Sequence, residues 1–471
     1  MRPTRRVPRA LLVFMSIASA VAVRPASAQD DRYWRQTYGT EATLLNGAVI
    51  GRATDVGTVF YNPAGLADVK NPSILLSGHV YEYEKIAAVG TSPITGEKLA
   101  IVQGSIRPAP SFFGGTIPWK ALGRHRLGYS VLTRQKGDVR NSFRAAAQLE
   151  VGLAQLEFVQ FNDMDETWVG PSWAWKASDR LSIGASMFVA VRSQYLRSQI
   201  TGQTLGTDDA VGLVSAIREF DYDSWRIVPK LGATLDLHPL TLGATVTVPS
   251  LRLWGSGSAL YNSTSNGIDF DGDGIPDPTF AANLQQEVQS NFKTGAAAGA
   301  GAGLDVGRNT TFFLSAEWYA GVTPYDVLST TSFNGQLDGV ERTNPLVHSA
   351  KSVVNVAAGV RHRFSPSVAG YLSGATDLSA ADTTYSLSVS KSVWDLYHVG
   401  GGVQLRISRV ELVLGGTYTF GSEDVIVGGP PQAPDLLADP VKFQQKGVRF
   451  IVGFQYSFTG NGGAAAPDDG S

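Results

Sequence analysis

The stretch that decides the fold spans residues 397–420 and reads YHVGGGVQLRISRVELVLGGTYTF. Its odd-numbered positions are apolar or glycine up to the dipeptide Ser408-Arg409, and beyond it the even-numbered positions take over that character. A change of phase across two residues predicts a β-hairpin with its turn at Ser408-Arg409, because that register puts every apolar residue on one face. The predicted opposing pairs are Ile407–Val410, Leu405–Leu412 and Tyr397–Phe420. A face that is apolar from end to end is typical of a strand that contacts lipid.

The same change of phase recurs elsewhere in the chain. Apolar residues alternate before and after His238-Pro239, which predicts a second hairpin, and proline suits a turn because it cannot donate to a strand ladder. Further short turns are predicted at residues 121–125, 177–180, 307–309 and 365–367. If both ends of the barrel lie on one side of the membrane, these turns together give about 14 antiparallel strands. The last strand is predicted over Phe443–Phe458.

The N-terminus predicts export from the cytoplasm. It combines an apolar run over Ala10–Val23 with the small residues Ala26-Ser27-Ala28, which are two parts of a cleavable signal. The third part is a basic start made of Arg2, Arg5, Arg6 and Arg9. No later stretch has ~18 consecutive apolar residues, so a helical membrane protein is not expected. A soluble β-sandwich also alternates, but it rarely sustains so many strands of ~10–12 residues. We therefore expect a transmembrane β-barrel.

Composition excludes several classes of function. The formal net charge is −2 and 17% of residues are charged. A nucleic-acid partner is therefore not expected, because phosphate binding needs clustered Lys and Arg. The absence of cysteine excludes disulfides, thiolate metal sites and a cysteine nucleophile. No G-x-S-x-G motif or phosphate-binding loop is present, and the histidines lack metal-ligand spacing. We expect a protein that is not an enzyme and requires no cofactor. The enzyme alternative is an outer-membrane hydrolase whose serine, histidine and acid meet only in the folded chain.

One acidic loop is a candidate calcium site. Alternate carboxylates before a glycine resemble the start of a calcium-binding loop, because they can surround one ion. The carboxylates belong to Asp269, Asp271, Asp273 and Asp277. The twelfth position of the loop is Phe280 instead of the glutamate of an EF-hand, so the spacing is closer to other short aspartate-rich calcium loops. The turn count places this segment in a long extracellular loop over about 255–285. The hypothesis is a structural calcium ion, and the alternative is a solvated acidic loop.

Residues 29–70 do not alternate, and the first strand is predicted to begin near Ser73. Within them, residues 60–67 read FYNPAGLA, and Pro63 forces Asn62 out of the α region, which produces a turn. About 40 residues of this kind in front of a barrel need a place to pack, and the lumen is the obvious one.

These residues carry a resemblance to a known family. Together with Gly47-Ala48, Asp55 and the sequence LGATVTVPS at residues 242–250, the segment FYNPAGLA resembles the FadL/TodX family of outer-membrane channels for hydrophobic compounds. The resemblance implies an N-terminal hatch that plugs the lumen and a lateral opening where a strand kinks. It also implies a hatch motif, which would comprise Asn62, Pro63, Ala64 and Gly65. One departure is the acidic start at Gln29-Asp30-Asp31, since the family's mature N-terminus is typically small and apolar.

The predicted organisation follows from these parts: a signal peptide (1–28), a hatch (29–70), a barrel (71–458) and a disordered periplasmic tail (459–471). The predicted function is passive uptake of hydrophobic molecules, long-chain fatty acids or similar, across the outer membrane of a Gram-negative-type bacterium. The expected partners are this ligand, outer-membrane lipid and lipopolysaccharide, and the barrel-assembly machinery, with the chain a monomer. The alternative is a structural, secretion or surface-attachment subunit. An apolar internal pocket would favour transport, and a charge-lined lumen would favour the alternative.

Overall fold

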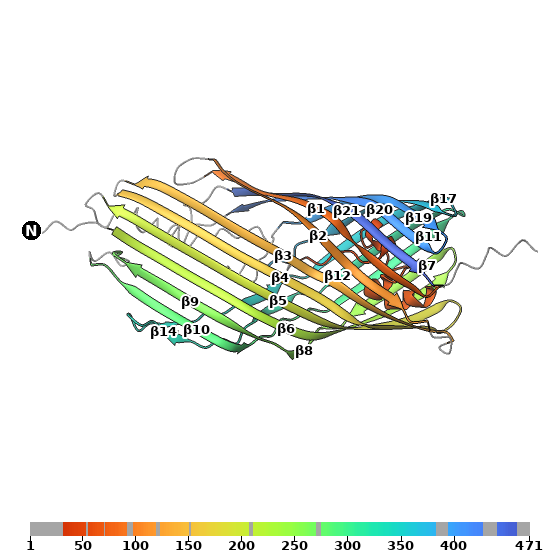
Figure 1. Ribbon diagram of the computed structural model, residues 1–471, viewed down its shortest axis with the longest axis horizontal. Coiled ribbons are helices and arrows are strands. Elements are labelled where there is room, and N and C mark those ends of the chain that lie inside the picture. Colours follow the sequence, from red (N-terminus) through yellow and green to blue (C-terminus); the bar gives the residue numbers. More distant parts are fainter. Residues whose placement is uncertain are drawn as a thin grey trace, which may run out of the picture.

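A closed antiparallel β-barrel of 14 strands forms the molecule, which confirms the predicted fold class (Figure 1). The computed structural model describes residues 32–52, 55–69, 71–91, 98–118, 123–149, 152–206, 211–269, 275–382, 394–426 and 440–458. Each barrel strand hydrogen-bonds to its neighbours in sequence, and β1 closes the barrel on β21.

Most barrel strands are single elements: β1 (Ser73–Thr91), β2 (Lys98–Thr116), β3 (His125–Leu149), β4 (Gly152–Lys176), β5 (Leu181–Gly206), β6 (Val211–Leu237), β18 (Val368–Asp377), β19 (Leu396–Ile407), β20 (Val410–Ile426) and β21 (Pro440–Ser457). The others are interrupted, namely β7 (Leu240–Thr247) with β8 (Leu251–Trp254) and β9 (Ser256–Asn266), β10 (Thr279–Gln289) with β11 (Ala297–Val306), β12 (Thr310–Tyr319) with β13 (Val322–Asp326), and β16 (Val347–Ala350) with β17 (Val353–Ser365). Outside the barrel sheet lie the hairpin β14 (Phe333–Asn334) and β15 (Glu341–Arg342), and the helices α2 (Thr40–Leu44), α3 (Thr58–Tyr61) and η1 (Pro63–Asp68). Among the described residues, no helix has the length and apolar character needed to cross a membrane.

Both hairpins have the register that the alternation predicts. In the β19–β20 pair the partners are Ile407–Val410, Leu405–Leu412 and Tyr397–Phe420. In the β6–β7 pair they are Leu237–Leu240 and Leu235–Leu242. The turns predicted at 177–180, 307–309 and 365–367 separate β4 from β5, β11 from β12 and β17 from β18. The turn predicted at 121–125 falls at the β2–β3 connection, where residues 119–122 lie outside the described residues.

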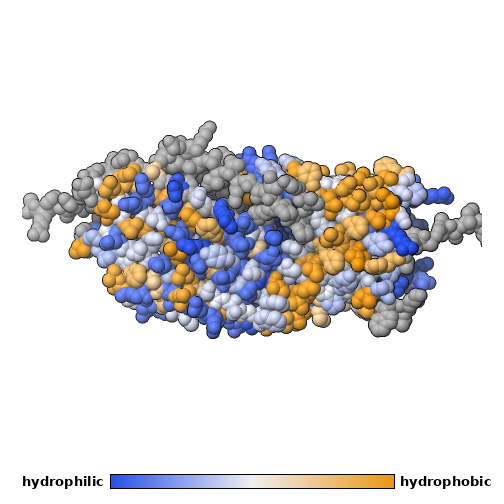
Figure 2. Space-filling view, in the orientation of Figure 1, coloured by the Kyte–Doolittle hydropathy of each residue, from blue (hydrophilic) through white to orange (hydrophobic). Residues whose placement is uncertain are grey.

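Exposed apolar side chains form a belt around the turn end of the barrel (Figure 2). On β20, for example, Leu414, Tyr418 and Phe420 are exposed. Toward the other end the surface is mixed and largely polar (Figure 2). Strands β3 to β6 have 25 to 27 residues, whereas ~9–11 residues cross a bilayer. These strands therefore extend far beyond the belt, on the side away from the turns.

The long loop expected over about 255–285 is a wrong prediction. Strands β9 and β10 occupy most of that range and pair with each other from Ser265–Thr279 to Ser256–Gln289. The connection between them is only residues 267–278. The sequence hides these strands because they lie beyond the apolar belt, where no lipid imposes an apolar face on alternate residues.

The turn at Ser408-Arg409 gives the first testable prediction. Ser408 has a φ of 56°, in the left-handed region, and Arg409 is not among the residues with positive φ. This is the pattern of a type II′ turn, which favours glycine at its first central position. We expect Ser408→Gly to raise the free energy of unfolding in urea by about 0.5–1 kcal/mol, because it removes the cost of a left-handed side chain.

The control is Arg409→Gly, which adds backbone freedom without relieving any strain and should lower the free energy of unfolding. A loss of stability in Ser408→Gly as large as in Arg409→Gly would contradict this account of the turn.

Candidate functional site

The N-terminal residues fill the lumen at the turn end of the barrel (Figure 1). We call residues 32–52 and 55–69 the luminal segment. Almost all of its side chains are buried, and they share one apolar core with inward-facing residues of the strands. Helix η1 contacts β3 to β6, and α2 contacts the opposite wall at β18 to β21. The segment therefore packs against both sides of the barrel.

The motif residues Asn62 to Gly65 attach the luminal segment to β6. The side-chain amide of Asn62 lies 2.9 Å from the Ile50 carbonyl oxygen, 3.0 Å from the Ala233 carbonyl oxygen and 3.1 Å from Thr234 Oγ1. Its Oδ1 accepts a hydrogen bond from the backbone N–H of Ala64 at 3.2 Å. Asn62 thus caps η1 and joins two parts of the segment to the wall.

Pro63 and Gly65 lie where neighbouring backbone and side-chain atoms leave no space for an additional Cβ atom. A Cβ atom on Gly184 of β5 would lie 2.5 Å from the Pro63 carbonyl carbon, and one on Gly232 of β6 would lie 2.1 Å from Asn62 Oδ1. A Cβ on Gly65 itself would lie 2.3 Å from Thr58 Oγ1. Glycine is required at such contacts because the backbones approach closely. The wall glycines therefore fit the motif that packs on them.

Asp55 holds the middle of the luminal segment together. Its carboxylate accepts hydrogen bonds from Thr40 Oγ1 at 2.9 Å, from the backbone N–H of Glu41 at 2.7 Å and from that of Gly57 at 2.7 Å. Burial raises the pKa of Asp55 to about 6, although these hydrogen bonds act in the opposite direction. Because the folded pKa exceeds the ordinary value of 3.8, the folded chain binds the proton more tightly. The resulting stability is fully present below 3.8 and is lost as pH rises through about 6.

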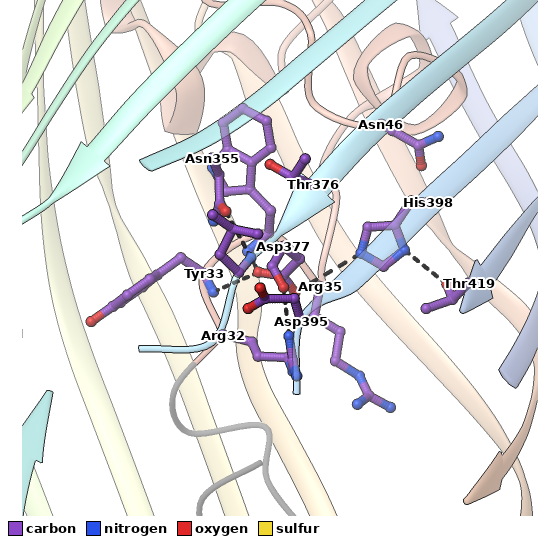
Figure 3. A network of polar contacts seen from close by, with 12 residues as sticks. Arg32, Tyr33, Arg35, Asn46, Asn355, Thr376, Asp377, Asp395, His398 and Thr419 are labelled. Carbon is purple, nitrogen blue, oxygen red and sulfur yellow. Dashed lines mark hydrogen bonds and ion pairs between the residues drawn. The ribbon is translucent and has the colours of Figure 1, made fainter. Parts of the chain in front are cut away.

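The start of the luminal segment, at Arg32 and Tyr33, is tied to the wall at β18 (Figure 3). The carboxylate of Asp377 accepts a hydrogen bond from the backbone N–H of Tyr33 at 3.2 Å, and the guanidinium of Arg32 donates to the Asp377 carbonyl oxygen. His398 Nε2 lies 3.9 Å from the same carboxylate, and its Nδ1 shares a hydrogen bond of 2.8 Å with Thr419. This network fixes the start of the luminal segment to β18 and β19.

A second group of charges ties the same stretch to β1 and β21. Arg35 forms ion pairs with Glu82 at 3.1 Å and Glu84 at 2.7 Å, and Arg449 of β21 pairs with Glu82 at 2.9 Å. All four side chains are nearly inaccessible to water. Removing one member would leave a buried charge without its partner, which is strongly destabilising.

The wall between β2 and β3 is only partly paired. The two strands pair from Thr116–Gly128 to Phe112–Leu132, and none of the described residues beyond that point forms a β2–β3 pair. Each strand has an extra residue where the pairing stops, Ser111 in β2 and Arg134 in β3. Such bulges bend a strand and end its pairing. The barrel wall therefore separates here.

This separation begins at the height of the apolar belt. On β1, Tyr83 is 47% exposed. Its partner on β2 is Ile106, which lies beyond the last β2–β3 pair. The apolar exterior on the β1 side therefore continues past the point where β2 and β3 part.

The luminal segment takes over contacts that the missing strand pairing leaves open. Tyr38 Oη donates to the Thr133 carbonyl oxygen of β3 at 3.1 Å, and Ser111 Oγ of β2 donates to the Thr37 carbonyl oxygen at 2.9 Å. Arg134 donates to the Tyr33 carbonyl oxygen at 2.9 Å. Sequence reasoning did not single out these residues, and the bulges that expose them leave no local signal.

A small aromatic-lined pocket lies behind this edge. The rings of Tyr33, Phe60, Trp168 and Tyr319 line it together with the charged side chains of Arg134, Lys230 and Glu317, and Tyr33 stacks on Tyr319 with centroids 3.9 Å apart. Its volume is about 20 Å³, the space of one water molecule. The pocket can therefore admit a hydrophobic ligand only if a lining side chain moves.

Beyond the pocket, on the side away from the turns, the lumen contains buried charges. Glu166 pairs with Arg192 at 3.1 Å and with Arg226 at 2.5 Å. Both guanidinium groups also lie over the ring of Phe292, at 3.9 Å and 4.9 Å from its centroid. Phe292 belongs to the interruption between β10 and β11, which turns into the lumen. This level of the lumen is therefore filled by charge pairs and an aromatic ring.

The calcium hypothesis stays a prediction. Asp271 and Asp273 lie outside the described residues. Asp269 and Asp277 are described, and the backbone N–H of Asp277 donates to the Ile268 carbonyl oxygen at 2.6 Å. Within the described ranges, no three acidic or histidine side chains cluster as metal ligands would.

Comparison with solved structures identifies the fold. A Pseudomonas aeruginosa FadL homologue aligns with a TM-score of 0.58 over 91% of this chain and 100% of its own, at 14% identity. The P. putida toluene transporter TodX aligns with a TM-score of 0.56 over 90% and 99%, at 12% identity. The CymD monoaromatic hydrocarbon channel gives 0.53 over 90% and 98%, at 14% identity. The chain has the FadL-type barrel fold. No family model and no curated protein matches the sequence.

The role of Asn62 is testable by Asn62→Ala. The change removes the donor to two carbonyl oxygens, that of Ile50 being buried, and the acceptor for Ala64. We expect the free energy of unfolding to fall by about 1–3 kcal/mol, because buried polar groups lose their partners. Hydrogen exchange at the Ala64 amide should accelerate, while the β19–β20 amides should keep their protection.

The matched control is Asn334→Ala in the exposed hairpin strand β14. It should leave both measurements unchanged. Equal exchange at Ala64 in wild type and Asn62→Ala would show that Asn62 does not anchor the luminal segment.

Proposed function

We propose that this chain is an outer-membrane channel for passive uptake of hydrophobic molecules, in which the ligand leaves the lumen sideways between β2 and β3. The observation that carries the proposal is the loss of β2–β3 pairing at the height of the apolar belt. A bilayer offers backbone groups no hydrogen bonds, so an unpaired edge at this depth needs a functional reason. A lateral exit supplies one, since an apolar ligand would pass directly from the lumen into the membrane.

The luminal segment acts as the hatch in this proposal. It blocks a straight path toward the turn end and covers the separated edge through Thr37 and Tyr38. A ligand moving sideways would have to displace the contacts that Thr37 and Tyr38 make with β2 and β3. The similar structures support a channel: one is named a toluene transporter and another a monoaromatic hydrocarbon channel. Fatty acids and aromatic hydrocarbons are the two candidate ligand classes.

A second candidate function has one observation in its favour. The lumen above the aromatic pocket carries the charge pairs of Glu166 with Arg192 and Arg226. A charged lumen is the feature that favours a structural or secretion subunit without transport. The test of the channel must therefore show movement of a ligand as well as binding.

The proposed exit can be closed by a reversible crosslink. The chain has no cysteine, so Ser111→Cys with Thr133→Cys introduces a single possible disulfide. These are the next positions beyond the last β2–β3 pair, Phe112–Leu132, which places them near each other where the gap begins. We expect uptake of radiolabelled oleate or toluene, by cells that lack their own channels of this type, to fall about tenfold or more on oxidation. Reductant should restore it.

The control pair is Phe113→Cys with Val131→Cys, which are direct partners in the paired part of β2 and β3. This crosslink should form without changing uptake. If the wild-type chain increases uptake of neither compound, the channel proposal is wrong. That result would support the structural or secretion role. If uptake occurs but does not change when the Ser111→Cys/Thr133→Cys variant is crosslinked, the lateral exit is elsewhere.

A further inference from the structure

A basic cavity of about 700 Å³ lies at the turn end of the barrel, between the luminal segment and the strand ends of β17 to β21. We call it the basic vestibule. The luminal segment contributes Arg52 and Val69 to its lining, and the turn residues Pro366 and Arg409 stand at the opposite wall. It lies on the opposite side of the luminal segment from the aromatic pocket, and it plays no part in the proposed lateral exit.

Positive charge exceeds negative charge in this cavity. Its lining contains five arginines, Arg52, Arg361, Arg363, Arg406 and Arg409, but only two acidic residues, Asp68 and Glu411. Arginine is the residue best suited to bind carboxylate and phosphate groups, because its planar fork offers paired donors.

Nearby acids neutralise only part of this charge. Arg52 pairs with Asp305 at 2.5 Å, Arg361 with Glu41 at 2.5 Å and Arg406 with Glu411 at 3.0 Å. Within the described part of the chain, no carboxylate lies within 4.0 Å of Arg363 or Arg409. The other acid of the lining, Asp68, pairs with Lys176 outside the cavity at 3.3 Å.

The strand register brings the guanidinium groups toward one another. Arg361 and Arg363 are alternate residues of β17 and point to the same face. Arg363 lies opposite Ala369 of β18, and Ala369 lies opposite Gln404 of β19, two residues before Arg406. The small side chain of Ala369 leaves the space between the arginines open. Among the described residues, Arg361 Nε is also a buried donor with no hydrogen-bond partner.

A neighbouring cavity shows that this excess is local. This neighbouring cavity, of about 520 Å³, shares Arg52 and Asp68 with the basic vestibule. Its lining carries equal numbers of lysine or arginine and aspartate residues, namely Arg52, Arg126, Lys176, Asp68, Asp236 and Asp305. Of these two cavities, only the basic vestibule therefore has an excess of positive charge.

We propose that the basic vestibule binds an oxyanion, a carboxylate or phosphate group, through Arg363, Arg409 and the partly neutralised arginines around them. The volume exceeds that of a bare phosphate several-fold, so the site takes the anionic end of a larger organic molecule. Two sources can supply this chemistry, a phosphate ester and a fatty carboxylate. The site does not depend on the channel proposal, because it lies apart from the gap between β2 and β3.

The test is isothermal titration calorimetry on the full chain in non-ionic detergent at low salt. The probes are inorganic phosphate, glycerol 3-phosphate and octanoate. We expect saturable binding of at least one probe, and a loss of about tenfold or more in affinity in Arg363→Gln/Arg409→Gln, because charge-assisted hydrogen bonds are lost. Tighter binding of the phosphate probes identifies a phosphate ligand, and tighter binding of octanoate identifies a carboxylate.

The matched control is Arg124→Gln/Arg180→Gln, which removes the same charge from exposed turn residues that line neither cavity. This variant should bind like the wild type. The proposal is overturned if no probe binds the wild type, if Arg363→Gln/Arg409→Gln keeps the wild-type affinity, or if the control loses as much. Unchanged thermal unfolding of both variants would show that neither result reflects misfolding.

Discussion

Backbone hydrogen bonding inside a bilayer is the constraint on which the rest of this structure depends. Lipid supplies no donors or acceptors, so a membrane-spanning sheet must close on itself and pair every strand. The chain meets this requirement around most of the barrel, where each strand pairs with both neighbours. The pairing is incomplete between β2 and β3. There Tyr38 and Thr37 of the luminal segment supply some of the hydrogen bonds that a neighbouring strand would otherwise make. The luminal segment and the barrel wall are therefore parts of one hydrogen-bonded structure.

The close fit between segment and wall follows from the glycines of the barrel interior. A Cβ on Gly301 of β11 would lie 2.5 Å from the backbone nitrogen of Gly51, and a Cβ on Gly243 would lie 2.0 Å from the Ile50 carbonyl oxygen. The small residues at 297–303 therefore leave room for a folded segment in the lumen. Packing of the luminal segment against the wall therefore accounts for glycines on the inner face of the strands.

What the sequence could predict depended on where lipid acts on the chain. In the belt, lipid demands an apolar residue at every second position, so the registers around Ser408-Arg409 and His238-Pro239 were readable from alternation alone. Beyond the belt both faces contact water or other protein, and β9 and β10 carry no such pattern. The luminal contacts were also hidden, because Asn62 meets Ala233 across 171 residues of sequence. Only the motif itself, through Pro63 and its glycine, marked the segment as one with a fixed conformation.

The distribution of charge in the lumen limits the routes open to an apolar molecule. Toward the turns it would meet the luminal segment and then the basic vestibule, whose arginines gain nothing from an apolar neighbour. At the level of Glu166 it would have to separate charges that are already paired and buried, which costs several kcal/mol per ion. Between these two regions lie the aromatic rings of Phe60 and Trp168, where the only buried ion pair among the pocket-lining residues described is Lys230–Glu317, and the separated edge of β3 is beside them. An apolar molecule at that level keeps its surface away from water and from paired charges if it moves sideways toward the lipid.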